Sequence, residues 1–360
     1  MAQYYAGLDV SMDLTDITNV DENGKIVFEA SVKTDPQSID NALKTAGFPI
    51  QKMSLESGSW SHWLVRELSS MGWNITCVDA RSISTLLALK TNKTDRNDAR
   101  GIAEAVRTQS QYVREVYQRS QESIDLGTLL TARRMLVEQR TALGNTMRGL
   151  LKSFGINLGS LSSNKISAKV DVEVTKYWPS ISDPLGTKIH GVLPKDYPVL
   201  AFEALSRCFT FLLKEIDVID ATLGLLAKKD ELIKRLMTVP GVGPLTAITY
   251  KVIIDNPRRF KAPRLVGAYL GMCPKQYSSG RVKRQGRISK KGSHELRTLL
   301  ASAGMKILTH CKKDSSLKTW GIKLAEKHGK KKAAVAIGRK MAIIMHHIWT
   351  KNTVFQSGEK

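Results

Sequence analysis

The fold of this chain is decided at its start, in residues 4–32, which read YYAGLDVSMDLTDITNVDENGKIVFEASV. Residues 4–10 and 14–20 are two short runs of strand-forming side chains with polar turn residues between them. The sequence DENG at residues 21–24 then favours a turn, and residues 25–32 alternate as a strand does. This pattern predicts three consecutive strands that are joined by short turns.

The sequence after this start alternates between helical and extended patterns. We predict helices over residues 38–46, 60–71, 82–89 and 98–108, and strands over residues 53–56 and 74–78. Consecutive strands followed by alternating helices and strands are typical of a mixed sheet that is covered by helices. We therefore expect an α/β domain that spans residues 1–112.

The middle of the chain holds two long helical stretches. The pattern is continuously helical from about residue 120 to 154, without proline, and again from about residue 199 to 237. Residues 155–196 are rich in Ser, Gly and Pro, and we interpret them as irregular. Such a pair favours antiparallel helices or an oligomerising coiled coil, with an ordinary helical subdomain as an equal alternative. We predict that this region spans residues 113–237, with an insert over residues 155–198.

The remaining domain, residues 238–360, opens with the sequence TVPGVGPLTA. Gly241 and Gly243 permit a tight turn into a helix, and the backbone N–H groups there could hold a DNA phosphate. The segment is similar to a helix-hairpin-helix DNA-binding element, although a plain connection between two helices has the same pattern. A helical run, a glycine-rich basic loop over residues 271–292 and further helices complete a mainly α-helical domain.

The charge of the chain is strongly positive and unevenly spread. The sequence has 55 Lys and Arg against 33 Asp and Glu, a net charge of +22. Residues 1–100 hold 10 Lys and Arg and 13 Asp and Glu, which is −3, whereas residues 237–360 hold 26 and 5, which is +21. A concentrated positive field favours a polyanion, because each neutralised phosphate releases counterions. We expect a nucleic-acid partner, with a basic protein that binds none as the alternative.

The composition excludes several other classes of protein. With 42% hydrophobic residues the chain is typical of globular proteins, and no apolar run is long enough to span a membrane. The first ten residues lack the basic start and apolar core of a signal peptide. The four cysteines form no CxxC pair, which argues against a disulfide framework and a cysteine zinc site. We expect a cytoplasmic protein without a membrane partner.

Four acidic residues stand where predicted elements end or begin. Asp9 closes the first strand in the sequence GLDVS, and Glu56 closes the fourth in LESGS. Asp95 and Asp98 lie in KTDRNDA at the start of a helix and share a helix face because they are three residues apart. Taken singly, each could be a solvated turn residue or a helix cap.

Carboxylates brought together from neighbouring strands and a helix are suited to cleaving a phosphodiester. Cleavage builds up charge on both the attacking and the leaving oxygen, and two divalent ions about 4 Å apart stabilise that charge. Hard cations such as Mg²⁺ prefer carboxylate oxygens. Apposed carboxylates repel one another unless a cation neutralises them, so their convergence would indicate a metal site.

The motifs GLDVS, LESGS and KTDRNDA together resemble those of the DEDD transposases of the insertion-sequence-110 family, which includes the insertion-sequence-1111 subgroup and the Piv-type DNA invertases. The later segments TVPGVGPLTA, FKAPRLVGAYLGMCPKQYSSG and GRISKKGSHELRTLL resemble the family's C-terminal transposase domain, in the same order. The resemblance implies a ribonuclease H-like (RuvC-like) first domain, long coiled-coil helices and a mainly α-helical last domain. It also implies a DNA recombinase that serves a mobile element.

The resemblance assigns roles to individual residues. Its catalytic and metal-binding tetrad falls on Asp9, Glu56, Asp95 and Asp98. Mg²⁺ or Mn²⁺ is the implied cofactor. The family's serine nucleophile falls in the sequence YSSG, where we take Ser279 as the nucleophile and keep Ser278 in reserve.

The surroundings of Ser279 are strongly basic, and guanidinium and ammonium groups suit phosphates. The predicted nucleic-acid-binding residues here are Arg281, Lys283, Arg284, Arg287, Lys290, Lys291 and Arg297. Gly241 and Gly243 complete the set at the helix-hairpin-helix-like turn. A serine hydroxyl is a weak nucleophile that needs activation. Without the resemblance, the favoured interpretation is a DNA-contact loop whose serines only hydrogen-bond phosphate.

The resemblance further implies a homo-oligomer, a dimer or tetramer, in which the carboxylates of one subunit meet the serine of another and a phosphoserine link to DNA forms. It also implies a structured guide RNA from the element, so that base pairing reads the sequence while the protein holds the backbone. Three alternatives stay open: a site-specific invertase with the same chemistry, a junction-resolving nuclease without a serine step, and a nucleic-acid-binding protein without strand transfer.

Overall fold

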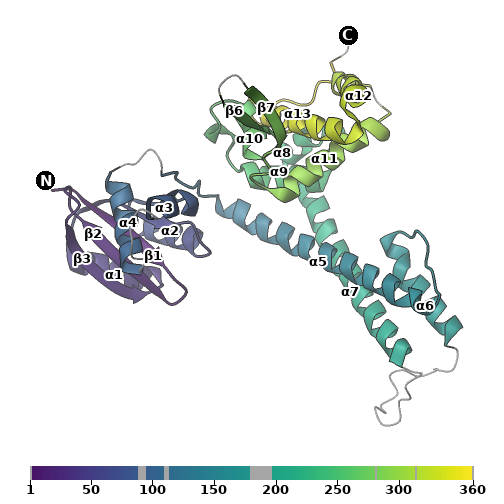
Figure 1. The fold of residues 1–360 in the computed structure, drawn as a ribbon, viewed down its shortest axis with the longest axis horizontal. Helices are drawn as coiled ribbons and strands as arrows, with labels where there is room; N and C mark the ends of the chain where they lie inside the picture. Colours follow the sequence, from purple (N-terminus) through teal and green to yellow (C-terminus); the bar gives the residue numbers. More distant parts are fainter. Residues whose placement is uncertain are drawn as a thin grey trace. The chain divides into compact units, whose positions relative to one another are not determined.

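The structure is a computed structural model, and it describes residues 2–87, 95–108, 113–178, 197–279, 282–312 and 314–358. For residues 85–87, 95, 278–279 and 282–283 only the backbone is described. The chain divides into two units, residues 1–119 and residues 120–360, which are treated separately below (Figure 1). No helix in the described ranges is long and apolar enough to cross a membrane.

The first unit is built on a five-stranded sheet with the strand order β3-β2-β1-β4-β5. The first three strands are β1 (Tyr4–Val10), β2 (Leu14–Val20) and β3 (Ile26–Lys33), and they pair antiparallel in sequence. β4 (Ile50–Glu56) and β5 (Ile75–Val78) add to β1 in parallel. The predicted mixed sheet with three strands at its start is therefore confirmed.

Helices cover both faces of this sheet. They are α1 (Pro36–Ala46), α2 (Ser61–Ser70), α3 (Ala80–Leu87) and α4 (Asp95–Arg107). Leu8 of β1 packs in one core with residues of α1 and α2, while Tyr5, three residues earlier in the same strand, packs in another core with Ala103 of α4. Because successive strand residues point to opposite faces, α1 and α2 lie on one face of β1 and α4 on the other.

The backbone of α4 packs closely against the sheet at Gly7, in the middle of β1. A Cβ atom on Gly7 would lie 2.1 Å from the carbonyl oxygen of Ala99 and 2.4 Å from the backbone nitrogen of Ala103. Real Cβ atoms do not approach backbone atoms this closely, so only glycine allows α4 to rest directly on the strand. The distance between α4 and β1 is thus set by the absence of one side chain.

We expect the substitution Gly7→Ala to destabilise the first unit by about 2–4 kcal/mol, because the added methyl group must push the backbone of α4 away. Hydrogen exchange of peptides that cover β1 and α4 measures this change without unfolding the second unit. Gly58→Ala is the matched control, since a Cβ there meets nothing within 4 Å. Equal protection of β1 in both variants would contradict the packing argument.

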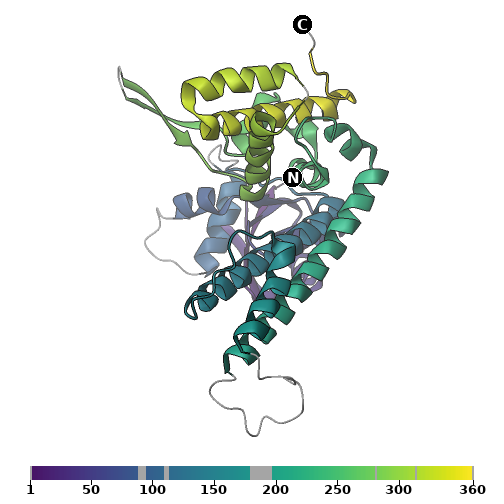
Figure 2. The same cartoon turned by 90° about the vertical axis from the view of Figure 1, so that its right-hand side faces the viewer.

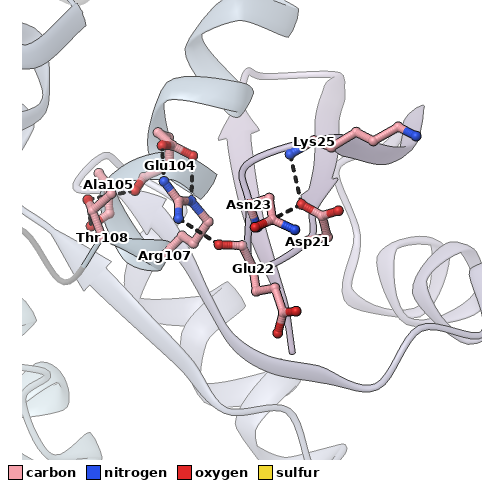
Figure 3. A network of polar contacts seen from close by, with 8 residues as sticks. All are labelled: Asp21, Glu22, Asn23, Lys25, Glu104, Ala105, Arg107 and Thr108. Carbon is pink, nitrogen blue, oxygen red and sulfur yellow. Dashed lines mark hydrogen bonds and ion pairs between the residues drawn. The ribbon is translucent and has the colours of Figure 1, made fainter. Parts of the chain in front are cut away.

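The far end of α4 is fastened to the turn between β2 and β3 (Figure 3). Arg107 donates one hydrogen bond to the carbonyl oxygen of Glu22 at 2.8 Å and pairs with Glu104, whose hydrogen bond raises the pKa of the Arg107 guanidinium. The turn is itself held by Asp21, whose carboxylate accepts from the backbone N–H groups of Asn23 and Lys25 at 2.9 Å. These contacts fix where the last turn of α4 lies on the sheet.

The second unit begins with two long helices, α5 (Gln121–Lys152) and α7 (Tyr197–Lys229). Arg133 of α5 pairs with Asp220 of α7, and farther along α5 the Cβ position of Gly144 lies 3.1 Å from the Phe209 ring. Partners on α7 have lower numbers as those on α5 rise, so the two helices run antiparallel (Figure 2). This arrangement is one of the two that the sequence favours.

Two departures from the predicted pattern occur around α7. The segment interpreted as irregular contains a 3-10 turn at Ser163–Lys165 and the helix α6 (Ile166–Tyr177), whose residues Ile166, Val170 and Val174 are buried in the core at its end of the long pair. The long helical stretch that follows also breaks, because the Asp230 side chain caps a new helix, α8 (Glu231–Leu236), by accepting from the N–H of Ile233.

The rest of the second unit is mainly helical, as predicted. It consists of α9 (Pro244–Ile254), a 3-10 turn (Pro257–Arg259), α10 (Arg264–Tyr269), β6 (Pro274–Ser279), β7 (Val282–Ile288), α11 (His294–Thr309), α12 (Ser316–His328) and α13 (Lys330–Lys351). Leu130 of α5 and Leu223 of α7 share one core with α9, α11 and α13. The long helices and the C-terminal helices therefore form a continuous hydrophobic core.

The segment predicted as a glycine-rich basic loop is instead an antiparallel hairpin of β6 and β7. Both of its strands carry long polar side chains, such as Gln276 opposite Gln285 and Tyr277 opposite Arg284. A ribbon without an apolar face gives no period-2 hydrophobic signal, which explains why the sequence pattern did not reveal it. Figure 2 shows the hairpin extending from the helices of its unit.

Candidate functional site

Two of the predicted acids, Asp9 and Glu56, lie at the ends of neighbouring strands. β1 and β4 are parallel neighbours, and Leu8 stands beside Leu55 in their register. One step further along both strands, the same register brings Asp9 beside Glu56. Because parallel strands end at the same edge, both carboxylates lie where the sheet gives way to loops.

The two acids also belong to the same face of the sheet. Gly7 meets α4, and Asp9 lies two residues further along β1, so it faces the same way. Ser54 pairs with Gly7, which puts Glu56, two residues after Ser54, on that face as well. Both side chains are half-buried. Asp9 and Glu56 therefore stand on the side of the sheet that α4 covers.

The direction of α4 brings its first turn to this edge. Tyr5, early in β1, packs with Ala103 and Val106, while Gly7, later in the strand, meets Ala99 and Ala103. The helix therefore runs antiparallel to β1 and starts near the end where Asp9 lies. Asp98 precedes the buried Ala99 and is half-buried itself. Three predicted acids thus occupy one edge and one face.

The fourth acid, Asp95, is the first residue of α4, but its side chain lies outside the described residues. Its backbone position, one turn before Asp98, is on the same helix face. Among the described side chains, no group of three or more Asp, Glu, His or Cys is close enough to hold a metal ion. The described carboxylates are hard oxygen donors that suit a divalent cation, yet they do not form a closed ligand set on their own.

The predicted nucleophile lies at the tip of the β6–β7 hairpin. The backbone pairs Ser278 with Lys283 and Ser279 with Val282. The side chains of both serines and of Lys283 lie outside the described residues, as does the whole of Arg281. A two-residue connection between paired strands projects these positions to the end of the ribbon.

The base of the hairpin is fixed by two close backbone contacts. A Cβ on Gly271 would lie 1.9 Å from the carbonyl oxygen of Lys291, and one on Gly292 would lie 2.1 Å from that of Tyr269. Both glycines have positive φ angles, 68° and 89°. The segment after β7, with the exposed Lys290 and Lys291, is thereby held against the end of α10.

Two family models match the sequence, one described as a transposase of DEDD type over residues 6–156 and one as the transposase IS116/IS110/IS902 family over residues 233–319. The transposase for insertion sequence element IS1111A of Coxiella burnetii (strain RSA 493 / Nine Mile phase I) is 30% identical, over 98% of this chain and 91% of its own length. The chain belongs to this family of transposases.

Other relatives agree over similar lengths. A probable family 20 transposase of Pseudomonas aeruginosa is 25% identical over 98% of each chain. The transposase for insertion sequence element IS1328 of Yersinia enterocolitica is 26% identical over 84% of this chain and 85% of its own. The first unit thus belongs to a DEDD transposase domain, matched over residues 6–156, with a ribonuclease H-like fold. Domains of this class typically use divalent metal ions, and the transposase has DNA as its substrate.

The sheet register places one further acid of the transposase that sequence reasoning did not single out. Asp16 of β2 is the direct partner of Asp9 across the β1–β2 ladder. Directly opposed residues of antiparallel strands share a face, and like charges in such a pair are unfavourable. Counting back from the turn between the two strands would have revealed this pairing.

Of the predicted nucleic-acid-binding residues, Arg297 and Gly241 have other roles in the structure. Arg297 is only 8% exposed, and its guanidinium donates to the carbonyl oxygen of Leu270 at 3.1 Å, so it is a core residue and not a phosphate contact. Gly241 has a φ of 80°, and its Cβ position lies 2.9 Å from the carbonyl oxygen of Ala303, so it serves close packing on α11. Gly243 precedes α9 as its N-terminal cap, with open space around its Cβ position.

Proposed function

We propose that this transposase mobilises an insertion sequence by cutting and rejoining DNA, with its carboxylate edge and a serine nucleophile as the reacting parts. The main support for the proposal is that Asp9 and Glu56 lie at the ends of two parallel strands and that Asp98 lies in the first turn of the helix that covers them. Carboxylate oxygens that come from two strand ends and from the start of a helix are ligands that suit a hard divalent cation. The relatives named above as transposases of insertion sequences support the substrate.

The four acids of the tetrad, Asp9, Glu56, Asp95 and Asp98, would hold Mg²⁺ or Mn²⁺. When bound, such ions stabilise the negative charge that builds up on phosphodiester oxygens during cleavage. The protein contributes the positions of the oxygens. Two come from strand ends, and two come from a helix whose far end is fastened through Arg107.

Ser279 would attack the scissile phosphorus through its hydroxyl oxygen. A new serine–phosphate ester forms while one deoxyribose oxygen leaves as a hydroxyl group, so the serine proton is balanced by the proton that the leaving group gains. The exchange needs no other reactant. One phosphate ester replaces another, so the serine–phosphate ester can later be attacked by a DNA hydroxyl group to rejoin the strand. Positive charge on and just after β7 would bind the phosphates that flank the cut; it comes from Arg284, Arg287, Lys290 and Lys291.

The proposal also includes a structured guide RNA and an active site that is shared between two subunits. The net charge of +21 over residues 237–360 exceeds what one short DNA contact needs, which supports a second nucleic acid. The carboxylates of one subunit would meet Ser279 of another. An invertase of the same chemistry would differ only in the DNA that it rearranges.

A stripe of exposed apolar side chains on α7 supports the oligomer. Phe211, Val218 and Leu225 follow one another at seven-residue spacing and are 60%, 61% and 60% exposed. Side chains at this spacing lie on one side of a helix, as in a coiled-coil seam. We propose that a second subunit covers this stripe.

We expect Val218→Lys to lower the mass measured by light scattering toward that of the monomer. Burying an unpaired ammonium group in the contact between subunits is more unfavourable than the burial of the apolar stripe is favourable. Ala201→Lys, at an exposed position of α7 outside the stripe, is the matched control and should keep the oligomer. A mass unchanged by Val218→Lys would rule out the stripe as the contact.

The experiment that tests the proposed function combines the full-length protein with DNA from the element ends, the RNA that flanks the gene, and Mg²⁺. A covalent protein–DNA adduct that survives denaturing electrophoresis is the expected product. Free nicked DNA without an adduct would favour a nuclease without a serine step. DNA that is bound but never cut would leave only a nucleic-acid-binding protein.

A further inference from the structure

A groove of about 1220 Å³ lies in the second unit between the β6–β7 hairpin and the last two helices. One wall is β7, and the other is formed by residues of α12 and α13. The sequence pattern drew attention to the hairpin alone. The structure adds a second wall that comes from a different part of the chain.

The groove is cationic on both walls. Arg284, Arg287 and Lys290 line it from the hairpin side, and Lys332, Arg339 and Lys340 line it from α13. None of the described lining residues is Asp or Glu. Cations placed on two facing walls without counter-charges between them suit a polyanion that runs along the groove.

Arg339 carries an independent sign of a missing partner. Its Nε atom is buried and has no hydrogen-bond partner among the described residues. The side chain lies against Gly267 of α10, whose Cβ position is 3.0 Å from the Arg339 Cγ atom, so the arginine stem is held in place by packing. A buried N–H donor without an acceptor is unfavourable, so a hydrogen-bond acceptor brought to this guanidinium would stabilise it.

The groove is also partly apolar, and this feature decides between double-stranded and single-stranded nucleic acid. Trp320, Ile343 and Met272 line it, and the Lys340 ammonium lies 4.6 Å from the centre of the Trp320 ring. A duplex presents phosphates and base edges, whereas a single strand also presents base faces that contact apolar and aromatic side chains. A groove that alternates cations with apolar surface therefore fits an unpaired strand.

We propose that this groove binds a single strand of DNA, with Arg339 and Lys340 on its phosphates and Trp320 against a base. The proposed function supplies the origin of the strand, since cutting at the nearby hairpin tip frees an end. Binding itself requires neither the metal nor Ser279. The groove would hold the freed strand until it is rejoined.

The test measures binding by the full-length protein in EDTA, so that cutting cannot contribute. The probe is fluorescein-labelled oligothymidylate of about 20 nucleotides, longer than one binding module covers. Oligouridylate and a duplex of equal length are compared with it. The variants are Arg339→Gln, Lys340→Gln, Trp320→Leu and Trp320→Phe, and Lys323→Gln on α12 is the control because it is exposed and does not line the groove.

We expect Arg339→Gln and Trp320→Leu each to weaken binding of the single-stranded DNA about tenfold, with Trp320→Phe close to the unmodified protein. The salt dependence separates their roles: Arg339→Gln and Lys340→Gln should each lower the slope of log affinity against log salt by about 0.7, and the Trp320 variants should leave it unchanged. Lys323→Gln should change neither affinity nor slope.

Two results would overturn the inference. The first is unchanged affinity in both Arg339→Gln and Lys340→Gln, the latter being an exposed residue whose loss does not threaten folding. The second is that the substitutions weaken oligouridylate or duplex while single-stranded DNA binds as before, which would assign the groove to another nucleic acid. Neither result would bear on the covalent adduct, so failure of the groove and failure of the proposed function are distinguishable.

Discussion

Asp98→Asn should reduce strand cutting by a factor of about a thousand or more while leaving the fold intact. The change replaces one carboxylate oxygen by an amide nitrogen of the same size, so the packing of α4 through Ala99 on Gly7 is preserved. A neutral amide is a poor ligand for a hard cation. Because asparagine keeps the size and polarity of this half-buried side chain, stability should stay nearly unchanged, which separates a catalytic defect from an unfolded protein.

The measurement is the rate at which end-labelled DNA is cut, followed on a sequencing gel, together with hydrogen exchange of the β1 peptides. Asp13→Asn is the matched control, because Asp13 is an exposed acid of the turn that follows β1 and lies outside the predicted tetrad. If the Asp98 variant cuts DNA at the rate of the control, Asp98 is not part of the catalytic site. DNA binding in EDTA should be equal in both.

The start of the chain could be read from sequence because its pattern is simple. Residues 4–10 and 14–20 are two largely buried strands with exposed polar residues between them, so the strand limits follow from where the polar residues stand. The position of Asp9 and Glu56 at one sheet edge follows from their places at strand ends. The direction of α4 could not be derived in this way, since it depends on the contact with Gly7 and on the anchor at Arg107.

Two failures of sequence reasoning share a physical cause, which is that local composition does not report burial. Arg297 stands in a basic run of the sequence and is therefore predicted to bind phosphate. In the structure it is buried and donates a hydrogen bond to the carbonyl oxygen of Leu270. The helix α6 lies in a segment rich in Ser and Gly. Its buried apolar residues at four-residue spacing, Ile166, Val170 and Val174, are too few to give a clear helical pattern in the sequence. In both cases tertiary contacts decided the outcome.

The second large effect is expected from Ser279→Ala, which should abolish the covalent protein–DNA adduct. Removing the hydroxyl leaves no oxygen to form the ester, so the residual adduct should fall below about one part in a thousand. Ser278→Ala is a close control, because it deletes the same group one residue away. In the backbone, the two serines pair with different residues, Ser278 with Lys283 and Ser279 with Val282.

The proposal assigns the reaction to a single hydroxyl group, so the two alanine variants should behave oppositely. Loss of the adduct in Ser278→Ala alone would move the nucleophile by one residue and keep the mechanism. Adduct formation by the double variant would mean that neither serine reacts, and the hairpin would then be only a contact for the DNA backbone. Equal binding of uncut DNA by both variants in EDTA ensures that a lost adduct reports chemistry, because the cations of β7 remain in place.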